Sequence, residues 1–268
     1  MNLKRTKNKI LRDSGALIFG LGGRMFKIPV IPSVFAEMKL EKKNFFLIKK
    51  DNFFCYYLID AEFVGLIQIA PRLTELEHYN EAEGIIRKYF HLAFADKGAW
   101  HEESLLNLIP SDCLFRFLSE EKKAEELNYW KNFLGGIFLP KSSCHGDFHA
   151  ENVLLKNGRL YFIDWTRYDA GSSRYFDLID FLIFSQKERG EGWMSFWKKV
   201  LDSNPREVYE IEIKSNYLIA YAFWKISQEL KTLYQRKKLS RQKGKKYLAF
   251  LDDFKGIIKN IKKDDFAN

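Results

Sequence analysis

Residues 144–165 read CHGDFHAENVLLKNGRLYFIDW, and this stretch decides the fold. Asn157-Gly158 stands between two apolar runs, which is a strong short-range signal for a β-hairpin with a two-residue turn. In an antiparallel pair, residues equally distant from the turn lie opposite each other. The pattern therefore predicts that Asn152 and Asp164 emerge side by side at the open end of one hairpin.

A third polar residue belongs to this group, because Asp147 lies on the loop that enters the same end of the hairpin. Mg²⁺ takes few oxygen ligands from a protein and fills its shell with waters and substrate phosphates. We predict that Asn152 and Asp164 hold Mg²⁺, which screens a polyphosphate from the carboxylates. Asp147 is then left to orient a hydroxyl and accept its proton. The competing interpretation, three ordinary turn residues, leaves their convergence unexplained.

The residues before the hairpin predict a small β-rich unit that carries one helix. We expect a strand, a glycine turn and a strand over 16–30, and a helix from Pro32 to about Lys50. Two further strands are expected over 53–59 and 64–69. The apolar stripe of the helix contains one charge, Glu41. Because a lone buried carboxylate is costly, either this face is partly open or a cation lies opposite Glu41.

After residue 75 the pattern becomes helical, which predicts an α+β protein. Helices are expected over 75–90 and 119–134, and from the end of the hairpin region almost to the end of the chain. Two stripes at helical spacing are expected to face the core: Ile219, Phe223, Ile226, Leu230 and Leu233, and Tyr247, Leu251, Phe254, Ile258 and Ile261.

The net charge of +9 over 268 residues is concentrated near the end of the chain. Residues 231–263 hold 12 basic and 2 acidic residues, so this segment alone carries +10. It is either a solvated helix face or a contact for an anionic partner. Three scattered cysteines fit a reducing compartment. The apolar run 16–21 is too short for a signal peptide, so we expect a cytoplasmic protein, with contact at the inner membrane face left open.

The order His-Gly-Asp-Phe-His-x-x-Asn-Val-Leu and then Ile-Asp-Trp resembles the aminoglycoside phosphotransferase and choline kinase group of kinase-like enzymes. The resemblance covers residues 145–180 tightly, including Gly171 and the Tyr-Phe-Asp-Leu of 175–178. It implies a bilobal protein-kinase-like fold, with a small β-rich nucleotide-binding lobe over 1–75 and a larger, mainly helical catalytic and acceptor-binding lobe over 76–268. It also implies Mg²⁺-dependent phosphoryl transfer from ATP, or from GTP, to a hydroxyl group.

The same resemblance implies a lysine on an N-lobe strand that pairs with a helix glutamate. Lys27 follows the glycine turn and supplies the partner that Glu41 needs, whereas another alignment puts Gln68 at the lysine position. We choose Lys27 as the residue that holds the phosphates. Three glycines of the preceding turn are expected to let backbone amides approach ATP: Gly20, Gly22 and Gly23.

The remaining residues of the block are expected to support the site. His145 and His149 brace the loop by hydrogen bonds rather than bind metal, because no third nitrogen or sulfur ligand stands nearby. Asp177 matches the family position that braces the catalytic loop. Trp165 and Thr166 replace the Phe and Gly of protein kinases, which argues against a protein substrate.

The acceptor stays open between several classes. We lean toward a small molecule or sugar hydroxyl, free or on an anionic glycolipid, because the basic segment would attract an anionic glycan or membrane surface. An aminoglycoside or choline/ethanolamine-type acceptor would instead use acidic residues: Asp169, Asp180, Glu188 and Glu191. A non-catalytic module that binds membrane or nucleic acid through 236–246 has no need of three converging polar residues, and no specific nucleic acid is expected.

Overall fold

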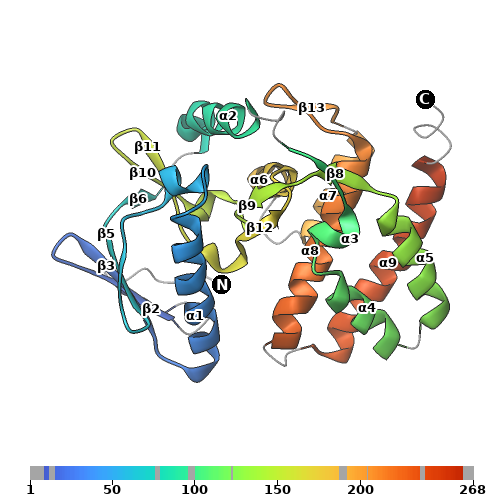
Figure 1. Cartoon of the computed structure of the whole chain (residues 1–268), viewed down its shortest axis with the longest axis horizontal. Coiled ribbons are helices and arrows are strands. Elements are labelled where there is room, and N and C mark those ends of the chain that lie inside the picture. The colour runs from blue at the N-terminus through green and yellow to red at the C-terminus, as the bar shows by residue number, and fades with distance from the viewer. Residues whose placement is uncertain are drawn as a thin grey trace.

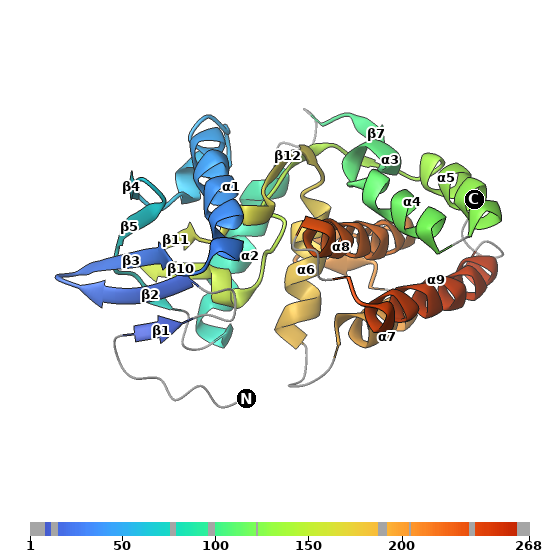
Figure 2. The same ribbon diagram turned by 90° about the horizontal axis from the view of Figure 1, so that it is seen from below.

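The structure is a computed structural model that describes residues 9–11, 16–75, 79–95, 100–121, 123–186, 192–203, 205–235 and 239–261. An antiparallel sheet with helix α1 forms one side of the molecule, and α4, α5, α7, α8 and α9 gather on the other (Figures 1 and 2). Strands β9 and β12 and helix α6 lie between them (Figure 1). The predicted α+β class is confirmed.

The strands are β1 (Lys9–Leu11), β2 (Ala16–Leu21), β3 (Arg24–Pro29), β4 (Glu62–Val64), β5 (Ile67–Pro71), β6 (Thr74–Glu75), β7 (Glu102–Ser104), β8 (Phe138–Pro140), β9 (Ser142–Cys144), β10 (Val153–Lys156), β11 (Arg159–Phe162), β12 (Asp169–Ser172), β13 (Glu207–Val208) and β14 (Ile211–Glu212). The helices are α1 (Pro32–Ile48), α2 (Tyr79–Ala95), α3 (Leu105–Leu108), α4 (Ser111–Glu120), α5 (Ala124–Gly135), α6 (Tyr175–Gln186), α7 (Trp193–Ser203), α8 (Ser215–Gln235) and α9 (Arg241–Ile261), with short 3-10 helices η1 (Phe54–Tyr57), η3 (Ala150–Asn152) and η4 (Trp165–Arg167).

The N-terminal sheet has the strand order β1-β2-β3-β5-β4. The predicted hairpin over 16–30 is present, and its turn residues Gly22 and Gly23 have φ values of 58° and 75°, which glycine adopts without a Cβ penalty. Lys27 on β3 lies directly opposite Gln68 on β5. The two candidate positions for the family lysine are therefore cross-strand neighbours.

Helix α1 packs with the face that the sequence pattern indicated. The four apolar residues of its stripe and Glu41 are all buried to 2% exposure or less: Val34, Met38, Glu41, Phe45 and Ile48. The helix ends within two residues of its predicted end. Its buried carboxylate settles the alternatives for this face, which is closed and therefore needs a cation.

The predicted strand over 53–59 is wrong. This segment forms η1, because Asp51 Oδ1 accepts the backbone N–H groups of Phe53 (2.8 Å) and Phe54 (2.7 Å) and so closes a turn. The following strand pair also differs from the prediction. The strand expected over 64–69 is β5, which begins at Ile67 and ends at Pro71, because a turn at Gly65, where φ is 62°, joins it to β4.

Two predicted helices have different limits. The helix expected over 75–90 is α2, which begins at Tyr79 and ends at Ala95. The helix expected over 119–134 is α5, which begins at Ala124 and ends at Gly135, because the preceding helix α4 extends to Glu120. Between Leu118 and Leu127 the sequence offers only one apolar side chain, an alanine, so one continuous helix would have nothing to pack there.

The hairpin that decides the fold has the predicted register. Leu154 lies opposite Tyr161, and Asn157 and Gly158 have φ values of 52° and 72°, as a type I′ turn requires. Strand β6 adds to the free edge of β10. The expected division after residue 75 adjoins 76–78, which lie outside the described residues, so the two-unit division stays a prediction.

The C-terminal helices pack as expected. Every residue of the stripe on α8 is buried, as are Tyr247, Leu251 and Phe254 on α9, while the side chains of residues 258 and 261 lie outside the described ones. The segment 236–246 includes undescribed residues 236–238 and the start of α9. Among the described helices, none has the length and apolar composition that a membrane span requires.

Gly146 and Gly158 make a matched pair for a stability test. Both have positive φ, but a Cβ at Gly146 would lie 2.2 Å from the carbonyl oxygen of Arg167, whereas nothing lies within 4 Å of one at Gly158. We predict that Gly158→Ala lowers the free energy of unfolding by about 1–2 kcal/mol. Gly146→Ala should lower it further, because the backbone itself has to shift. Urea denaturation of both variants measures this, and equal losses would contradict it.

Candidate active site

The loop that carries Asp147 is held in place by one buried carboxylate. Asp177, at the start of α6, accepts the backbone N–H of His145 with Oδ2 (2.7 Å) and that of Gly146 with Oδ1 (2.9 Å). Burial raises the pKa of Asp177 to about 7, although the two backbone hydrogen bonds lower it. Asp177 thus makes the bracing contacts expected of it.

His145 ties the same loop to the end of strand β11. Burial lowers its pKa to about 4, so the ring is neutral near pH 7. Its Nε2 lies 3.0 Å from the carbonyl oxygen of Ile163, which can only accept, so Nε2 carries the proton. Nδ1 is then free to accept the N–H of Asp147 at 3.3 Å. His145 therefore acts through hydrogen bonds.

Asn152 is oriented by its own amide nitrogen. Nδ2 donates to the carbonyl oxygen of Asp147 at 2.9 Å and lies 3.2 Å from Nε2 of His149. Because these contacts use the nitrogen, Oδ1 is the atom that remains for a metal ion or ligand. His149 thus contacts both Asn152 and, at 3.7 Å, Oδ2 of Asp147.

Asp164 has a backbone conformation that is unusual for its residue type, with φ 61° and ψ 60°. Such left-handed residues concentrate at functional sites, where the surrounding structure enforces them. Burial raises the pKa of Asp164, but the charge of Lys27 and a hydrogen bond from Thr166 Oγ1 (2.9 Å) bring the net value below the usual one. Asp164 is therefore ionised at neutral pH.

The cation that Glu41 requires is Lys27. Lys27 Nζ lies 2.5 Å from Glu41 Oε2, and the glutamate side chain is only 3% exposed. The predicted pair is thus present in the structure. Gln68, the alternative lysine position, is the cross-strand neighbour of Lys27.

Helix α1 also reaches the turn that follows Asp164. Asn44 Nδ2 donates to the carbonyl oxygen of Trp165 at 2.7 Å, and Asn44 is buried. Asn44 was not among the predicted site residues. Its signal was a second polar residue three positions after Glu41, on a helix face that is otherwise apolar.

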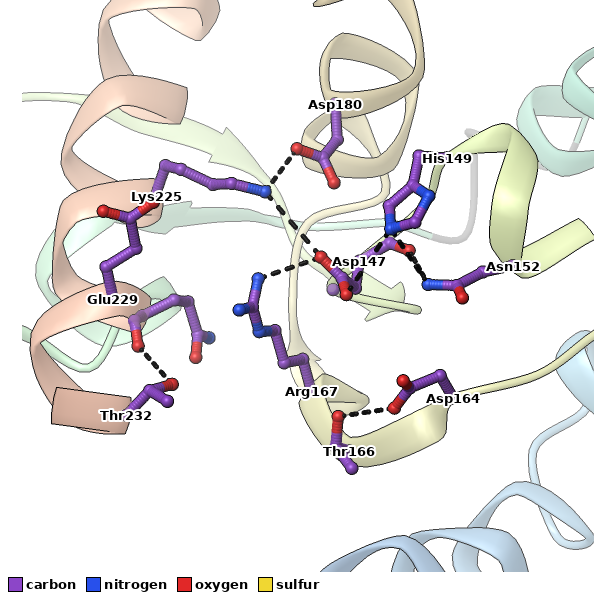
Figure 3. Close-up of polar contacts among 12 residues, drawn as sticks. Asp147, His149, Asn152, Asp164, Thr166, Arg167, Asp180, Lys225, Glu229 and Thr232 are labelled. Atoms are coloured by element: carbon purple, nitrogen blue, oxygen red, sulfur yellow. Dashed lines mark hydrogen bonds and ion pairs between the residues drawn. The ribbon is translucent and has the colours of Figure 1, made fainter. Parts of the chain in front are cut away.

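Asp147 lies among cations from different parts of the chain (Figure 3). Arg167 Nη1 donates to Asp147 Oδ1 at 2.9 Å, and Lys225 Nζ lies 3.9 Å from the same oxygen. Burial raises the pKa of Asp147, but Arg167, His149 and Lys225 together lower it by more. The resulting pKa of Asp147 is well below its usual value. Asp147 is therefore a carboxylate and a weak base.

Lys225 has a closer partner in Asp180. Asp180 Oδ1 accepts from Lys225 Nζ and from Tyr221 Oη, each at 2.6 Å, and all three residues are buried. Sequence reasoning missed Lys225 and Arg167 because both are remote in sequence from Asp147. The available signal for Lys225 was its position as the one charged residue in the otherwise apolar run 217–226.

The acidic residues that a cationic acceptor would need do not form one group among the described residues. Asp180 is paired with Lys225, and Asp169 Oδ1 accepts the N–H of Gly171 at 2.8 Å. Glu188 and Glu191 lie outside the described residues.

The structure gives the places of the three predicted phosphate-binding glycines in the first hairpin. Gly20 lies in β2, and Gly22 and Gly23 form the turn between β2 and β3, where nothing lies within 4 Å of a Cβ added to either turn residue. Contact with phosphates stays a prediction. Across the described residues, no three His, Cys, Asp or Glu side chains gather as a metal site, so the predicted one rests on Asp164 and the amide of Asn152.

The profile of a family described as "Phosphotransferase enzyme family" (APH) matches residues 64–210. Choline kinase LicA from Streptococcus pneumoniae has a similar structure, with a TM-score of 0.54 and 15% identity over 88% of this chain and 89% of that one. The APH(2″)-IIa ternary complex with streptomycin and ATP has a TM-score of 0.49 and 15% identity over 90% of each chain. No curated protein sequence matches this chain.

Proposed function

Because the chain belongs to the phosphotransferase enzyme family, whose members transfer phosphate to hydroxyl acceptors, we propose a catalytic role for the loop before the hairpin. In this proposal, Asp147 is the residue that activates the acceptor hydroxyl. The observation that carries this proposal is the convergence of Asp147, Asn152 and Asp164 at one end of the hairpin, with the Lys27–Glu41 pair close enough to influence Asp164. As a small-molecule kinase that uses ATP, the protein needs such a site for the phosphates and for the reacting hydroxyl.

The donor set at the hairpin end fits Mg²⁺. Asp164 is ionised, and Asn152 is turned so that its amide oxygen is the uncommitted atom. Both are the hard oxygen donors that Mg²⁺ takes alongside waters and phosphates. Asn152 and Asp164 would hold the ion, which when bound neutralises the negative charge of the β- and γ-phosphates.

Asp147 supplies orientation more than basicity. Its Oδ1 is engaged by Arg167, which leaves Oδ2 to accept a hydrogen bond from the acceptor hydroxyl. Because its pKa is low, Asp147 takes the proton only as the new P–O bond forms and the hydroxyl becomes acidic. The neutral His145 keeps the backbone of Asp147 in place during this transfer.

Lys27 is proposed to contact the phosphates of ATP, with Glu41 holding its ammonium group toward them. The glycines at positions 20, 22 and 23 are proposed to let backbone N–H groups approach those phosphates. Lys27 already lowers the pKa of Asp164, so the charge that receives the phosphates lies near the acid that would hold the metal ion.

For the acceptor, we propose a sugar hydroxyl, free or within an anionic glycolipid. The environment of Asp180 supports this choice, because this carboxylate is fully buried and paired with Lys225, and so is not presented to an ammonium group of the acceptor. The basic segment 231–263 offers positive charge to an anionic glycan or to a membrane surface. Choline, as for the similar kinase LicA, and an aminoglycoside are the alternatives that the test below includes.

The proposed function predicts acceptor-dependent formation of ADP. Purified protein would be mixed with Mg²⁺ and ATP, or GTP, and a panel of neutral sugars, sugar acids, choline, ethanolamine and kanamycin. A coupled assay measures ADP, and mass spectrometry detects the phosphorylated product. We expect a sugar or sugar acid to give the highest rate. A higher rate with choline or kanamycin would reject the sugar assignment, and no turnover above the Asp147→Ala variant with any acceptor would reject the kinase role of this site.

The proposed division of labour predicts different losses in two variants. Asp147→Ala should lower kcat at least about 1,000-fold, the order expected when an orienting and proton-accepting group is lost. It should leave the Kd for Mg·ATP nearly unchanged, because Asp147 is not a metal ligand in this scheme. Asp164→Ala should weaken Mg·ATP binding. Calorimetric titration compares the two, and an equal loss of affinity would contradict the assignment.

The choice of Lys27 over its neighbour Gln68 predicts an order of effects. Lys27→Ala should lower kcat/KM for ATP about 100-fold, as expected when a charge that meets the phosphates is removed. Gln68→Ala should change it only a few-fold, since Gln68 lies beside Lys27 on the adjacent strand but carries no charge to offer the phosphates. Steady-state kinetics with varied ATP measures this, and the reverse order would show that the lysine position was misassigned.

A further inference from the structure

Lys225 occupies a place where a charged residue needs an explanation. It is 2% exposed in the middle of α8, and most of that helix is buried among the apolar side chains of the helical side. Removing an ammonium group from water costs free energy that only close partners offset. An apolar residue would fill the same space without this cost, so packing alone does not account for Lys225.

The partners of Lys225 connect it to the reacting centre. Its Nζ lies 2.6 Å from Asp180 Oδ1 and 3.9 Å from Asp147 Oδ1, so one ammonium group lies between the carboxylates of α6 and of the catalytic loop (Figure 3). Asp180 Oδ2 has no hydrogen-bond partner among the described residues. Within the described part of the chain, the partners of Asp180 therefore meet the oxygen that faces Lys225.

Aromatic rings limit where the ammonium group can go. Lys225 Nζ lies 4.8 Å from the centre of the Phe184 ring and 5.5 Å from that of Trp224. The face of an aromatic ring attracts a cation within about 6 Å. Asp180 and these two rings together define one position for Nζ, beside Asp147.

Two cations therefore approach the same oxygen of Asp147. Arg167 reaches Oδ1 from η4 and Lys225 approaches it from α8, while Oδ2 has His149 at 3.7 Å. A carboxylate can rotate about its Cβ–Cγ bond, because this terminal torsion has broad energy wells. Charges fixed on one oxygen oppose that rotation and keep the other oxygen toward the acceptor.

We propose that Lys225, itself held by Asp180, is a positioning residue that fixes the carboxylate of Asp147 with Oδ2 toward the acceptor hydroxyl. This inference rests on the proposed role of Asp147. It gives α8 a part in the transfer step through Asp147, since a displacement of about 1 Å in a reacting group can cost about 100-fold in rate.

Tyr221 offers a matched control. Its hydroxyl donates to the same Asp180 Oδ1 from one turn earlier on α8, and it makes no described hydrogen bond to Asp147. If the cluster only joins α6 to α8, Lys225→Met and Tyr221→Phe should affect turnover alike. If Lys225 positions Asp147, only Lys225→Met should lower kcat.

The test measures kcat and KM for ATP, by phosphate release with water as acceptor and by ADP formation with the best acceptor of the panel. We expect Lys225→Met to lower kcat about 100-fold with KM for ATP changed less than about 3-fold. Lys225→Arg should recover much of the loss, and Tyr221→Phe should stay within about 3-fold of the unmodified protein. Equal losses in Tyr221→Phe and Lys225→Met, or an unchanged kcat in Lys225→Met, would overturn the proposal.

A second variant guards against misfolding, because Lys225→Met leaves the carboxylate of Asp180 buried without its cation. The double variant Asp180→Asn with Lys225→Met removes both charges, and we expect the same loss of kcat. Crystal structures of the unmodified protein and this variant add a readout that needs no turnover. A rotated or multiply placed Asp147 carboxylate supports the proposal, whereas an unchanged one overturns it, even if the proposed kinase function itself fails.

Discussion

The carboxylate of Asp177 is the constraint on which the site depends. It is fully buried, and each of its oxygens accepts one N–H from consecutive residues of the loop, His145 and Gly146. Two acceptors on one rigid group fix two adjacent peptide planes, and the positive φ of Gly146 lets the chain turn there. The next residue is Asp147, so the direction of its side chain is set from α6 before any ligand arrives.

Helix α1 connects Lys27, the proposed phosphate-binding residue, to the turn that follows the hairpin. Glu41 pairs with Lys27 of the sheet, and Asn44, one turn later, donates to the carbonyl oxygen of Trp165. Asp164 directly precedes Trp165, and its left-handed backbone is held between this bond and the end of β11. A shift of α1 would therefore move the partner of Lys27 and the turn after Asp164 together. The ammonium group of Lys27 also lowers the pKa of Asp164 directly.

The sequence predicted what depends on local pattern and missed what depends on packing. The Asn157-Gly158 turn fixes a register by its own dihedral angles, and so Asn152 and Asp164 could be placed together. The need of a buried carboxylate for a cation led from Glu41 to Lys27. In contrast, no local sequence pattern indicates that Arg167 and Lys225 meet at Asp147, because tertiary packing brings them together. The strand expected over 53–59 was wrong because the side chain of Asp51 accepts two backbone N–H groups, which closes a turn there.

The charges beside Asp147 bear on the kind of acceptor. Arg167 and Lys225 are cations, and Asp147 and Asp180 are carboxylates, so the four groups balance. Glu229 adds one more negative group, but Trp193 Nε1 and Tyr247 Oη donate to its two oxygens. These neutral donors leave the charge of Glu229 in place, so the five groups together carry −1. The preference for a sugar therefore rests on the pairing of Asp180 and not on the net charge: an ammonium group would have to compete with Lys225 for Asp180, whereas an uncharged hydroxyl only has to reach Oδ2 of Asp147.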